Sequence, residues 1–171
     1  INSILDEGFL TNHTYVKKLE KKFCKFNKSK YSVGVNSGTA ALELILRSLD
    51  IKNKKVLVSS NTFIATALAI KSAGGHPVPV DIDKDYFGLC LVDLKKKLNK
   101  NIGAVIVVHI GGLVTNNIIK IKKICTKKNI PLVEDCAQAF GSSYNNLKVG
   151  NFGLAGAFSF QTTKVVTSGE G

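Results

Sequence analysis

The sequence predicts an α/β fold in three layers, αβα, in which helices cover both faces of a mostly parallel sheet. Short apolar runs alternate along the chain with longer segments that carry apolar residues at helical spacing. The runs, for example residues 104–108, are apolar at every position, as expected for parallel strands buried on both faces. At 171 residues the chain can form one sizeable core, and we expect a single domain over residues 1–171.

The first half of the chain opens with a predicted helix. Four apolar residues at three- and four-residue steps define it: Val16, Leu19, Phe23 and Phe26. A β-prone run follows at residues 31–35. Aliphatic residues at helical spacing then predict a helix over 37–49, and residues 56–60 predict a buried strand. Residues 62–73 predict the next helix, which Gly74-Gly75 ends.

The second half continues the same alternation. Two more helices are predicted by residues that share one face, namely Leu91, Leu94 and Leu98 in one helix and Ile118, Ile121 and Cys125 in the other. The predicted strands of this half are 76–81, 104–108, 131–134 and 155–160. In parallel sheets, ligands bind beyond the carboxyl ends of the strands. Polar residues follow these strand ends and should gather at one edge: Ser59-Ser60-Asn61, Asp81, His109, Asp135 and the loop with Lys164.

Several function classes lack their motifs. No GxGxxG motif fits a dinucleotide-binding domain, and no Walker loop is present. No apolar segment is long enough to cross a membrane. Four cysteines share no metal-ligand spacing, so we expect no metal site and reduced thiols in a cytoplasmic protein: Cys24, Cys90, Cys125 and Cys136.

The chain is basic, with 24 Lys and Arg against 12 Asp and Glu and a formal net charge of +12. Such a charge is compatible with nucleic-acid binding. The lysines are dispersed, however, and no aromatic residues lie between them as a base-stacking surface requires. We therefore interpret the lysines as residues on solvent-exposed helix faces and expect no nucleic-acid partner. The positive electrostatic field of the chain would still favour anionic ligands.

Lys164 is the first candidate catalytic residue. It lies on a loop after the predicted strand 155–160, where its amine can form a Schiff base with a carbonyl cofactor. Asp135 follows the strand 131–134, and a carboxylate there can hold a pyridine nitrogen protonated; a helix cap or an ion pair is the other interpretation. Gln138 lies one helical turn further and can reach a neighbouring ring oxygen.

Small residues at a strand-to-helix junction indicate a phosphate site. In Asn36-Ser37-Gly38-Thr39-Ala40, a helix start offers unpaired N–H groups to an anion, although an ordinary Ser or Thr cap fits the same residues. Ser159 adds a hydroxyl for phosphate. Phe63 supplies an aromatic ring, either for stacking on a planar cofactor or for the core. With Lys164 and Asp135, these are the parts that a pyridoxal phosphate site needs.

These motifs together resemble the large domain of the DegT/DnrJ/EryC1/StrS sugar aminotransferases, which are fold-type-I pyridoxal phosphate enzymes with an aspartate aminotransferase-like fold. The matching motifs extend over nearly the whole chain in the family's order: Gly8-Phe-Leu-Thr-Asn12, Ser37-Gly-Thr-Ala-Ala41, Asn61-Thr-Phe-Ile-Ala65, Pro77-Val-Pro-Val-Asp-Ile-Asp83, Glu134-Asp-Cys-Ala-Gln138, and Gly141 to Gly171.

The resemblance implies a role for each candidate residue. Lys164 is the Schiff-base lysine, Asp135 faces the pyridine nitrogen, and Gln138 lies near the ring hydroxyl. Phe63 stacks on the ring. Four residues bind the phosphate: Gly38, Thr39, Ala40 and Ser159. Two residues approach the sugar substrate: Thr11 and Asn12.

The resemblance also implies a reaction. A homodimer transfers an amino group, commonly from the amino-acid donor glutamate, to a nucleotide-linked keto sugar for surface polysaccharide or glycoside biosynthesis. The alternatives are sugar dehydration or aminoarene synthesis on the same cofactor, and a non-catalytic remnant of the fold. Because a dehydratase branch of the family has histidine at the lysine position, Lys164 favours transamination.

Both ends of the chain suggest an N-terminal piece of a longer enzyme. The chain begins without methionine and stops soon after Lys164. We expect the C-terminal small domain to be absent and the piece alone to be inactive or unstable, because a sheet cut midway exposes apolar surface. Four positions depart from the family pattern: Asn12-His13-Thr14-Tyr15, His109-Ile-Gly-Gly112, Leu154 and Gln161.

Overall fold

The computed structural model describes residues 2–8 and 14–171. The chain divides into two compact units, Ile1–Gly34 and Val35–Gly171. The first unit contains helices α1 (Asn2–Glu7) and α2 (Thr14–Asn27). The second contains every strand of the described structure.

In the first unit, α2 confirms the helix that the spacing of apolar residues predicts. The strand predicted at residues 31–35 is wrong, because this segment forms no strand. The side chains of Tyr31 and Val33 are 74% and 79% exposed. Aromatic and β-branched residues favour a strand only where neighbours pack against them, and this segment has no strand partner in the described structure. Hydrogen bonds of 2.7 Å to Glu20 fix it instead.

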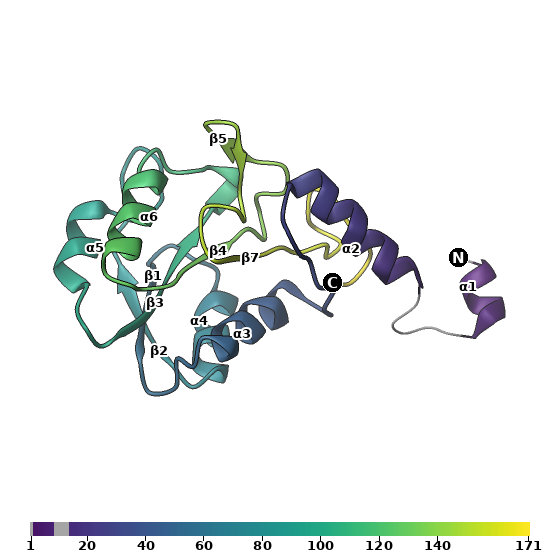
Figure 1. Cartoon of the computed structure of the whole chain (residues 1–171), viewed down its shortest axis with the longest axis horizontal. Coiled ribbons are helices and arrows are strands. Elements are labelled where there is room, and N and C mark those ends of the chain that lie inside the picture. Colours follow the sequence, from purple (N-terminus) through teal and green to yellow (C-terminus); the bar gives the residue numbers. More distant parts are fainter. Residues whose placement is uncertain (1, 9–13) are drawn as a thin grey trace. The chain divides into compact units, whose positions relative to one another are not determined.

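A five-stranded parallel sheet forms the centre of the second unit (Figure 1). Its strands, in spatial order, are β2 (His76–Val80), β1 (Lys55–Ser59), β3 (Ile102–Val108), β4 (Leu132–Asp135) and β7 (Ala155–Ala157). All four neighbouring pairs are parallel, which confirms the predicted sheet. The strand β7 is shorter than the predicted strand 155–160, because its backbone pairing with β4 ends at the register pair of Asp135 and Ala157.

The order of the sheet explains why β2 tolerates two prolines. Pro77 and Pro79 are two residues apart, so the positions of their missing N–H groups face the same side of the strand. Because β2 is at the edge of the sheet, that side needs no partner strand. The edge position of β2 therefore explains why the strand can contain both prolines.

Helices cover both faces of the sheet, so the three predicted layers are confirmed (Figure 1). Along β3, Ala104, Ile106 and Val108 pack with α3 (Gly38–Ser48) and α4 (Ile64–Ser72). The alternate residues Val105 and Val107 pack with α5 (Leu91–Lys97) and α6 (Ile118–Lys127). This alternation follows from the pleat of a strand, which directs successive side chains to opposite faces.

Four short elements were not predicted, and α1 is the first of them. A 3-10 turn, η1 (Ile110–Gly112), follows β3, and the strands β5 (Ser143–Tyr144) and β6 (Leu147–Lys148) form a hairpin. The two residues between these strands, Asn145 and Asn146, have φ angles of 49° and 61°. Asparagine tolerates positive φ, and two such residues form a tight hairpin turn. The Asn-Asn pair was therefore a usable signal.

The predicted polar edge is confirmed. Ser59 and Asp135 are the last residues of β1 and β4, and Asp81 and His109 directly follow β2 and β3. Because the strands are parallel, all four lie at the carboxyl edge of the sheet. In the described ranges, none of the helices has both the length and the apolar character that crossing a bilayer requires.

Burial divides the four free cysteines into two pairs. Cys24 and Cys90 are half-buried, whereas Cys125 and Cys136 are buried. Burial raises the pKa of the Cys125 thiol to about 11. Burial, with the charges of Glu134 and Asp135 nearby, raises the pKa of Cys136 well above 9.0.

At neutral pH we expect iodoacetamide to modify Cys24 and Cys90 in the folded protein and to spare Cys125 and Cys136, because the thiolate is the reactive form. Peptide mapping by mass spectrometry measures this, with the denatured protein as the control in which all four react. Since the folded state holds the Cys125 proton more tightly, its contribution to stability is present below pH 9.0 and is lost as the pH rises through about 11. Equal labelling of the two pairs in the folded protein would contradict the assignment.

Candidate functional site

A pocket of about 450 Å³ opens at the carboxyl edge of the sheet. Its walls come from the first turns of α3 and α4, the ends of β3 and β4, and the loop after β7. Seven of the residues predicted to bind the cofactor line it: Gly38, Thr39, Phe63, Asp135, Gln138, Ser159 and Lys164. Ala40 does not line the pocket, and its predicted role stays a prediction. Thr11 and Asn12 lie outside the described residues.

The first turn of α3 presents N–H groups to the pocket. Ser37 caps the helix, because its hydroxyl oxygen accepts the Ala40 N–H at 3.1 Å and its carbonyl oxygen accepts the Ala41 N–H at 3.0 Å. The cap interpretation of Ser37 is thus confirmed. The N–H groups of Gly38 and Thr39 have no partner within the helix and lie at the pocket wall. The cap therefore leaves two N–H groups available in the same turn, and the phosphate site stays a prediction.

Gly38 allows α3 to approach the segment after β7. A Cβ atom added at position 38 would lie 3.1 Å from the Cβ of Ser159 and 3.2 Å from the carbonyl oxygen of Phe158. Such contacts are tighter than a side chain normally tolerates. The glycine therefore brings the α3 N–H groups and the buried Ser159 to the same part of the pocket.

Lys164 reaches the pocket from the loop after β7. Its N–H donates to the Gln161 carbonyl oxygen at 2.9 Å, which closes a turn in this loop. The side chain is half-buried, and among the described residues Lys164 is the only lysine that lines the pocket. Lys164 and the acid Asp135 are therefore parts of one cavity, although 29 positions separate them in the sequence.

Asp135 is held by two donors. Its Oδ1 accepts the Ala137 N–H at 3.1 Å, and its Oδ2 accepts the Thr66 hydroxyl at 2.8 Å. The Thr66 hydroxyl is also hydrogen-bonded to the Thr62 hydroxyl at 2.7 Å. Asp135 is 7% exposed, so these contacts set its orientation at the pocket. The sequence analysis identified neither threonine, because nothing local links position 66 to position 135.

Gln138 presents a donor to the pocket. Its Oε1 accepts the Gly111 N–H at 2.8 Å, so its side-chain nitrogen is left to donate elsewhere. Gly111 has a φ of 58°, in the left-handed region that favours glycine. The sequence departure at residues 109–112 therefore supplies the backbone turn that orients Gln138.

Phe63 lies at the pocket and directly precedes α4. Its side chain is 68% exposed, so Phe63 is not part of the core. A planar ligand in the pocket would find an aromatic face here.

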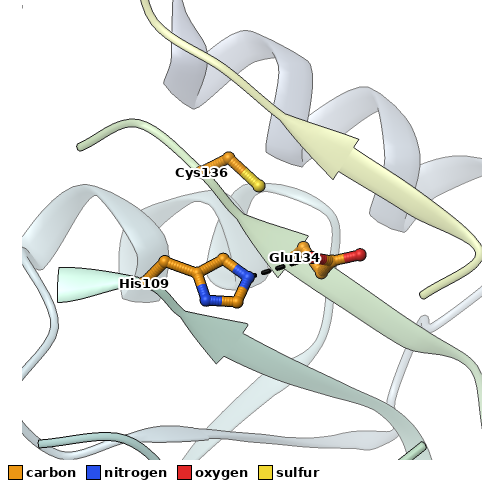
Figure 2. Close-up of side chains that lie close together, drawn as sticks. All are labelled: His109, Glu134 and Cys136. Atoms are coloured by element: carbon orange, nitrogen blue, oxygen red, sulfur yellow. Dashed lines mark hydrogen bonds and ion pairs between the residues drawn. The ribbon is translucent and has the colours of Figure 1, made fainter. Parts of the chain in front are cut away.

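Figure 2 shows His109, Glu134 and Cys136 close together, and His109 also lines the pocket. Glu134 precedes Asp135 in β4, so its side chain points away from the pocket. Its Oε2 accepts hydrogen bonds from His109 Nε2 at 2.9 Å and the Gly150 N–H at 2.8 Å, and its Oε1 accepts the Gly153 N–H at 2.7 Å. The side chains of His109 and Glu134 are fully buried. We call these four hydrogen-bonded residues the Glu134 clamp.

The three residues in Figure 2 could in principle bind a metal, because one ligand atom from each lies within 4.8 Å of the others. One observation argues against this: both oxygens of Glu134 already accept hydrogen bonds from N–H groups. The clamp instead fixes residues 150–153, the segment that leads to β7 and the Lys164 loop. A fully buried Glu needs such partners, which the sequence analysis did not consider.

Comparison with known proteins gives a consistent result. A family model described as the DegT/DnrJ/EryC1/StrS aminotransferase family matches residues 1–171. A GDP-perosamine synthase of Vibrio cholerae is 35% identical over 173 residues, which is 100% of this chain and 47% of that protein. A dTDP-3-amino-3,6-dideoxy-alpha-D-galactopyranose transaminase of Aneurinibacillus thermoaerophilus is 37% identical over 161 residues, 94% of this chain and 44% of that protein. The chain thus spans about half the length of these relatives.

Solved structures share the fold at similar identity. An aminotransferase from Psychrobacter cryohalolentis matches with a TM-score of 0.93 and 29% identity, over 99% of this chain and 44% of that one. A GDP-4-keto-6-deoxy-D-mannose-3-dehydratase of Escherichia coli, solved with bound hydrated PLP (pyridoxal phosphate), matches with a TM-score of 0.91 and 30% identity, over 99% and 45% of the two chains. Transamination and dehydration therefore both occur among proteins similar to this chain.

Proposed function

Because the chain belongs to the DegT/DnrJ/EryC1/StrS aminotransferase family, whose cofactor is pyridoxal 5′-phosphate, we propose that the protein transfers an amino group to a nucleotide-linked keto sugar. The observation that carries this proposal is the convergence of Lys164, Asp135 and the first turn of α3 on one pocket. We further propose that residues 1–171 form the part of the enzyme that binds this cofactor.

The pocket residues fit the chemical groups of the cofactor. A volume of about 450 Å³ lies in the range of small-molecule sites. The N–H groups of Gly38 and Thr39 would hold the phosphate, together with the Ser159 hydroxyl. The Asp135 carboxylate would pair with the ring nitrogen. Phe63 would cover the ring from its place at the pocket wall.

Two further side chains complete the proposed site. Gln138 would donate from its side-chain nitrogen to the ring hydroxyl, because its Oε1 is already used by Gly111. The Lys164 amine would hold the cofactor carbonyl and, once displaced by substrate, would carry protons between substrate and cofactor carbons. When bound, the cofactor supplies an electron sink for the bond that breaks at the substrate carbon.

The finer parts of the proposal concern substrates and assembly. We propose a keto sugar linked to a nucleotide, since similar proteins act on GDP- and dTDP-linked sugars by their names. We also propose glutamate as amino donor, a homodimer as the active form, and a role in polysaccharide or glycoside biosynthesis. The basic chain, with a net charge of +12, would favour the approach of an anionic nucleotide sugar.

The test is a half-reaction. The full-length enzyme that contains residues 1–171 is loaded with pyridoxal phosphate and incubated with L-glutamate, and pyridoxamine phosphate and 2-oxoglutarate are measured by chromatography. Equal amounts of both products support the proposal. GDP-, dTDP- and UDP-linked keto sugars added to the aminated enzyme then identify the acceptor. Cofactor binding without any amination by glutamate or another amino acid would contradict transamination.

Sugar dehydration is the second candidate function, favoured by the similarity to the Escherichia coli dehydratase. The two reactions differ in their product. A dehydratase releases a deoxygenated sugar and incorporates no nitrogen, whereas a transaminase incorporates the nitrogen of ¹⁵N-labelled glutamate. Mass spectrometry of the sugar product separates them.

We expect Gly38→Ala to weaken pyridoxal phosphate binding by roughly tenfold or more, because the new methyl group forces α3 away from Ser159 and Phe158. Fluorescence titration measures the Kd. Ser72→Ala is the control, since it changes an exposed side chain at the end of α4 that does not line the pocket. Unchanged affinity in Gly38→Ala would contradict the proposed phosphate site.

A further inference from the structure

We propose that Thr66, supported by Thr62, is a positioning residue for the acid that faces the cofactor ring. This inference rests on the proposed function and adds to it a residue that the sequence motifs did not identify. Thr66 is on the first turns of α4 and is 1% exposed. Its hydroxyl lies 2.8 Å from Asp135 Oδ2, and Asp135 comes from β4, 69 residues along the chain.

The direction of the hydrogen bonds follows from the inventory of donors. An ionised carboxylate only accepts, so the single hydroxyl proton of Thr66 points to Asp135. The Thr66 oxygen must then accept the proton of the Thr62 hydroxyl, 2.7 Å away. Both hydroxyls are therefore oriented toward the carboxylate, and we call this pair the hydroxyl relay.

The hydroxyl relay and a backbone N–H group together restrict the orientation of the Asp135 carboxylate. Oδ1 accepts the Ala137 N–H and Oδ2 accepts the Thr66 hydroxyl, so rotation of the carboxylate breaks at least one bond. Both bonds lie in a largely buried environment, where a lost hydrogen bond is costly. The remaining acceptor positions are thereby held toward the pocket, in one orientation for a ring N–H.

The hydroxyl relay also joins two parts of the proposed site. Phe63 and Thr66 are three residues apart at the start of α4, so they lie on neighbouring positions of one helical turn. Phe63 flanks the pocket with its aromatic ring, and Thr66 fixes the acid. A displacement of this turn would move the ring-covering residue and the carboxylate contact together.

The experiment compares two ligands. One is pyridoxal phosphate, and the other is its deaza analogue, in which C–H replaces the ring nitrogen. A residue that acts through the contact between Asp135 and the ring nitrogen changes the preference between the two, whereas a residue that only supports the fold changes both affinities alike. The measured quantity is the ratio of the two Kd values, with the folded state of every variant checked by circular dichroism.

We expect Thr66→Val to lower the preference for pyridoxal phosphate by about tenfold, the size of one hydrogen bond to a charged group. Thr66→Ser, which keeps the hydroxyl, should retain the preference within about twofold. Thr62→Val removes only the outer hydroxyl and should cause a smaller loss. Thr62→Val can take the place of Thr66→Val in the comparison if Thr66→Val does not fold. Thr126→Val, an exposed position of α6, is the matched control.

Equal weakening of both ligands in Thr66→Val, or an unchanged ratio, overturns the inference and leaves the proposed function intact. The inference is also overturned if Thr66→Ser loses the preference for pyridoxal phosphate as Thr66→Val does. The hydroxyl at position 66 would then not be the cause of the preference. If the unsubstituted protein binds neither ligand, the proposed function itself is refuted, and this inference with it.

Discussion

Replacing Lys164 by alanine should abolish covalent attachment of pyridoxal phosphate and lower the rate of the half-reaction by roughly a hundredfold to ten-thousandfold. The physical reason is that Lys164 is the only lysine lining the pocket among the described residues, so no other amine there can replace it. The measurement is borohydride reduction of the loaded protein, followed by mass spectrometry that locates the pyridoxyl group.

Two controls test whether the effect depends on the amine of Lys164, rather than on a positive charge in the pocket or on the loss of any lysine. Lys164→Arg keeps a cation in the pocket but lacks an amine that condenses with an aldehyde, so it should fail as Lys164→Ala does. Lys127→Ala removes an exposed lysine of α6 and should leave attachment unchanged. Stoichiometric labelling of another lysine in Lys164→Ala, with the activity retained, would refute the assignment.

Replacing Glu134 by alanine should destabilise the fold by about 3–5 kcal/mol, because each buried donor that loses its acceptor costs about 1–3 kcal/mol. The substitution leaves three donors without an acceptor: the N–H groups of Gly150 and Gly153, and His109 Nε2. His109 and Glu134 have no exposed side-chain surface, so water cannot take the place of the carboxylate without opening the structure. Urea unfolding measures the loss in the free energy of unfolding.

The matched control is Glu43→Ala. Glu43 pairs with Arg47 on α3 at 2.8 Å, and the two side chains are 30% and 55% exposed. Such a surface pair contributes only about 0.3–0.5 kcal/mol. Should Glu134→Ala not fold at all, Glu134→Gln keeps one acceptor oxygen and should give an intermediate loss. A loss for Glu134→Ala as small as that for Glu43→Ala would contradict the clamp.

The Glu134 clamp and the Lys164 pocket are connected through β4. Successive residues of this strand point to opposite faces, so Glu134 fixes the segment before β7 while Asp135 faces the pocket. Under the proposed function, the same short motif serves stability through Glu134 and cofactor binding through Asp135. We expect the two roles to separate experimentally: substitutions of Glu134 change mainly unfolding, whereas substitutions of Asp135 change mainly cofactor binding.

The α/β alternation, the polar edge and most of the candidate pocket residues could be predicted from the amino-acid sequence. These depend on local signals: the period of apolar residues, the small residues at the start of α3, and the polar residues at strand ends. The prediction at 31–35 was wrong because local β-propensity has an effect only when another strand is available to pair.

Only the tertiary structure decided which distant groups meet. The bond between Thr66 and Asp135, the approach of Gly38 to Ser159 and the partners of Glu134 each join segments that are far apart in the chain. These contacts depend on how helices pack on the sheet and on how loops cross its edge. Local sequence patterns do not reveal such packing. A helical threonine looks the same in the sequence whether its hydroxyl is hydrogen-bonded to water or to a buried carboxylate.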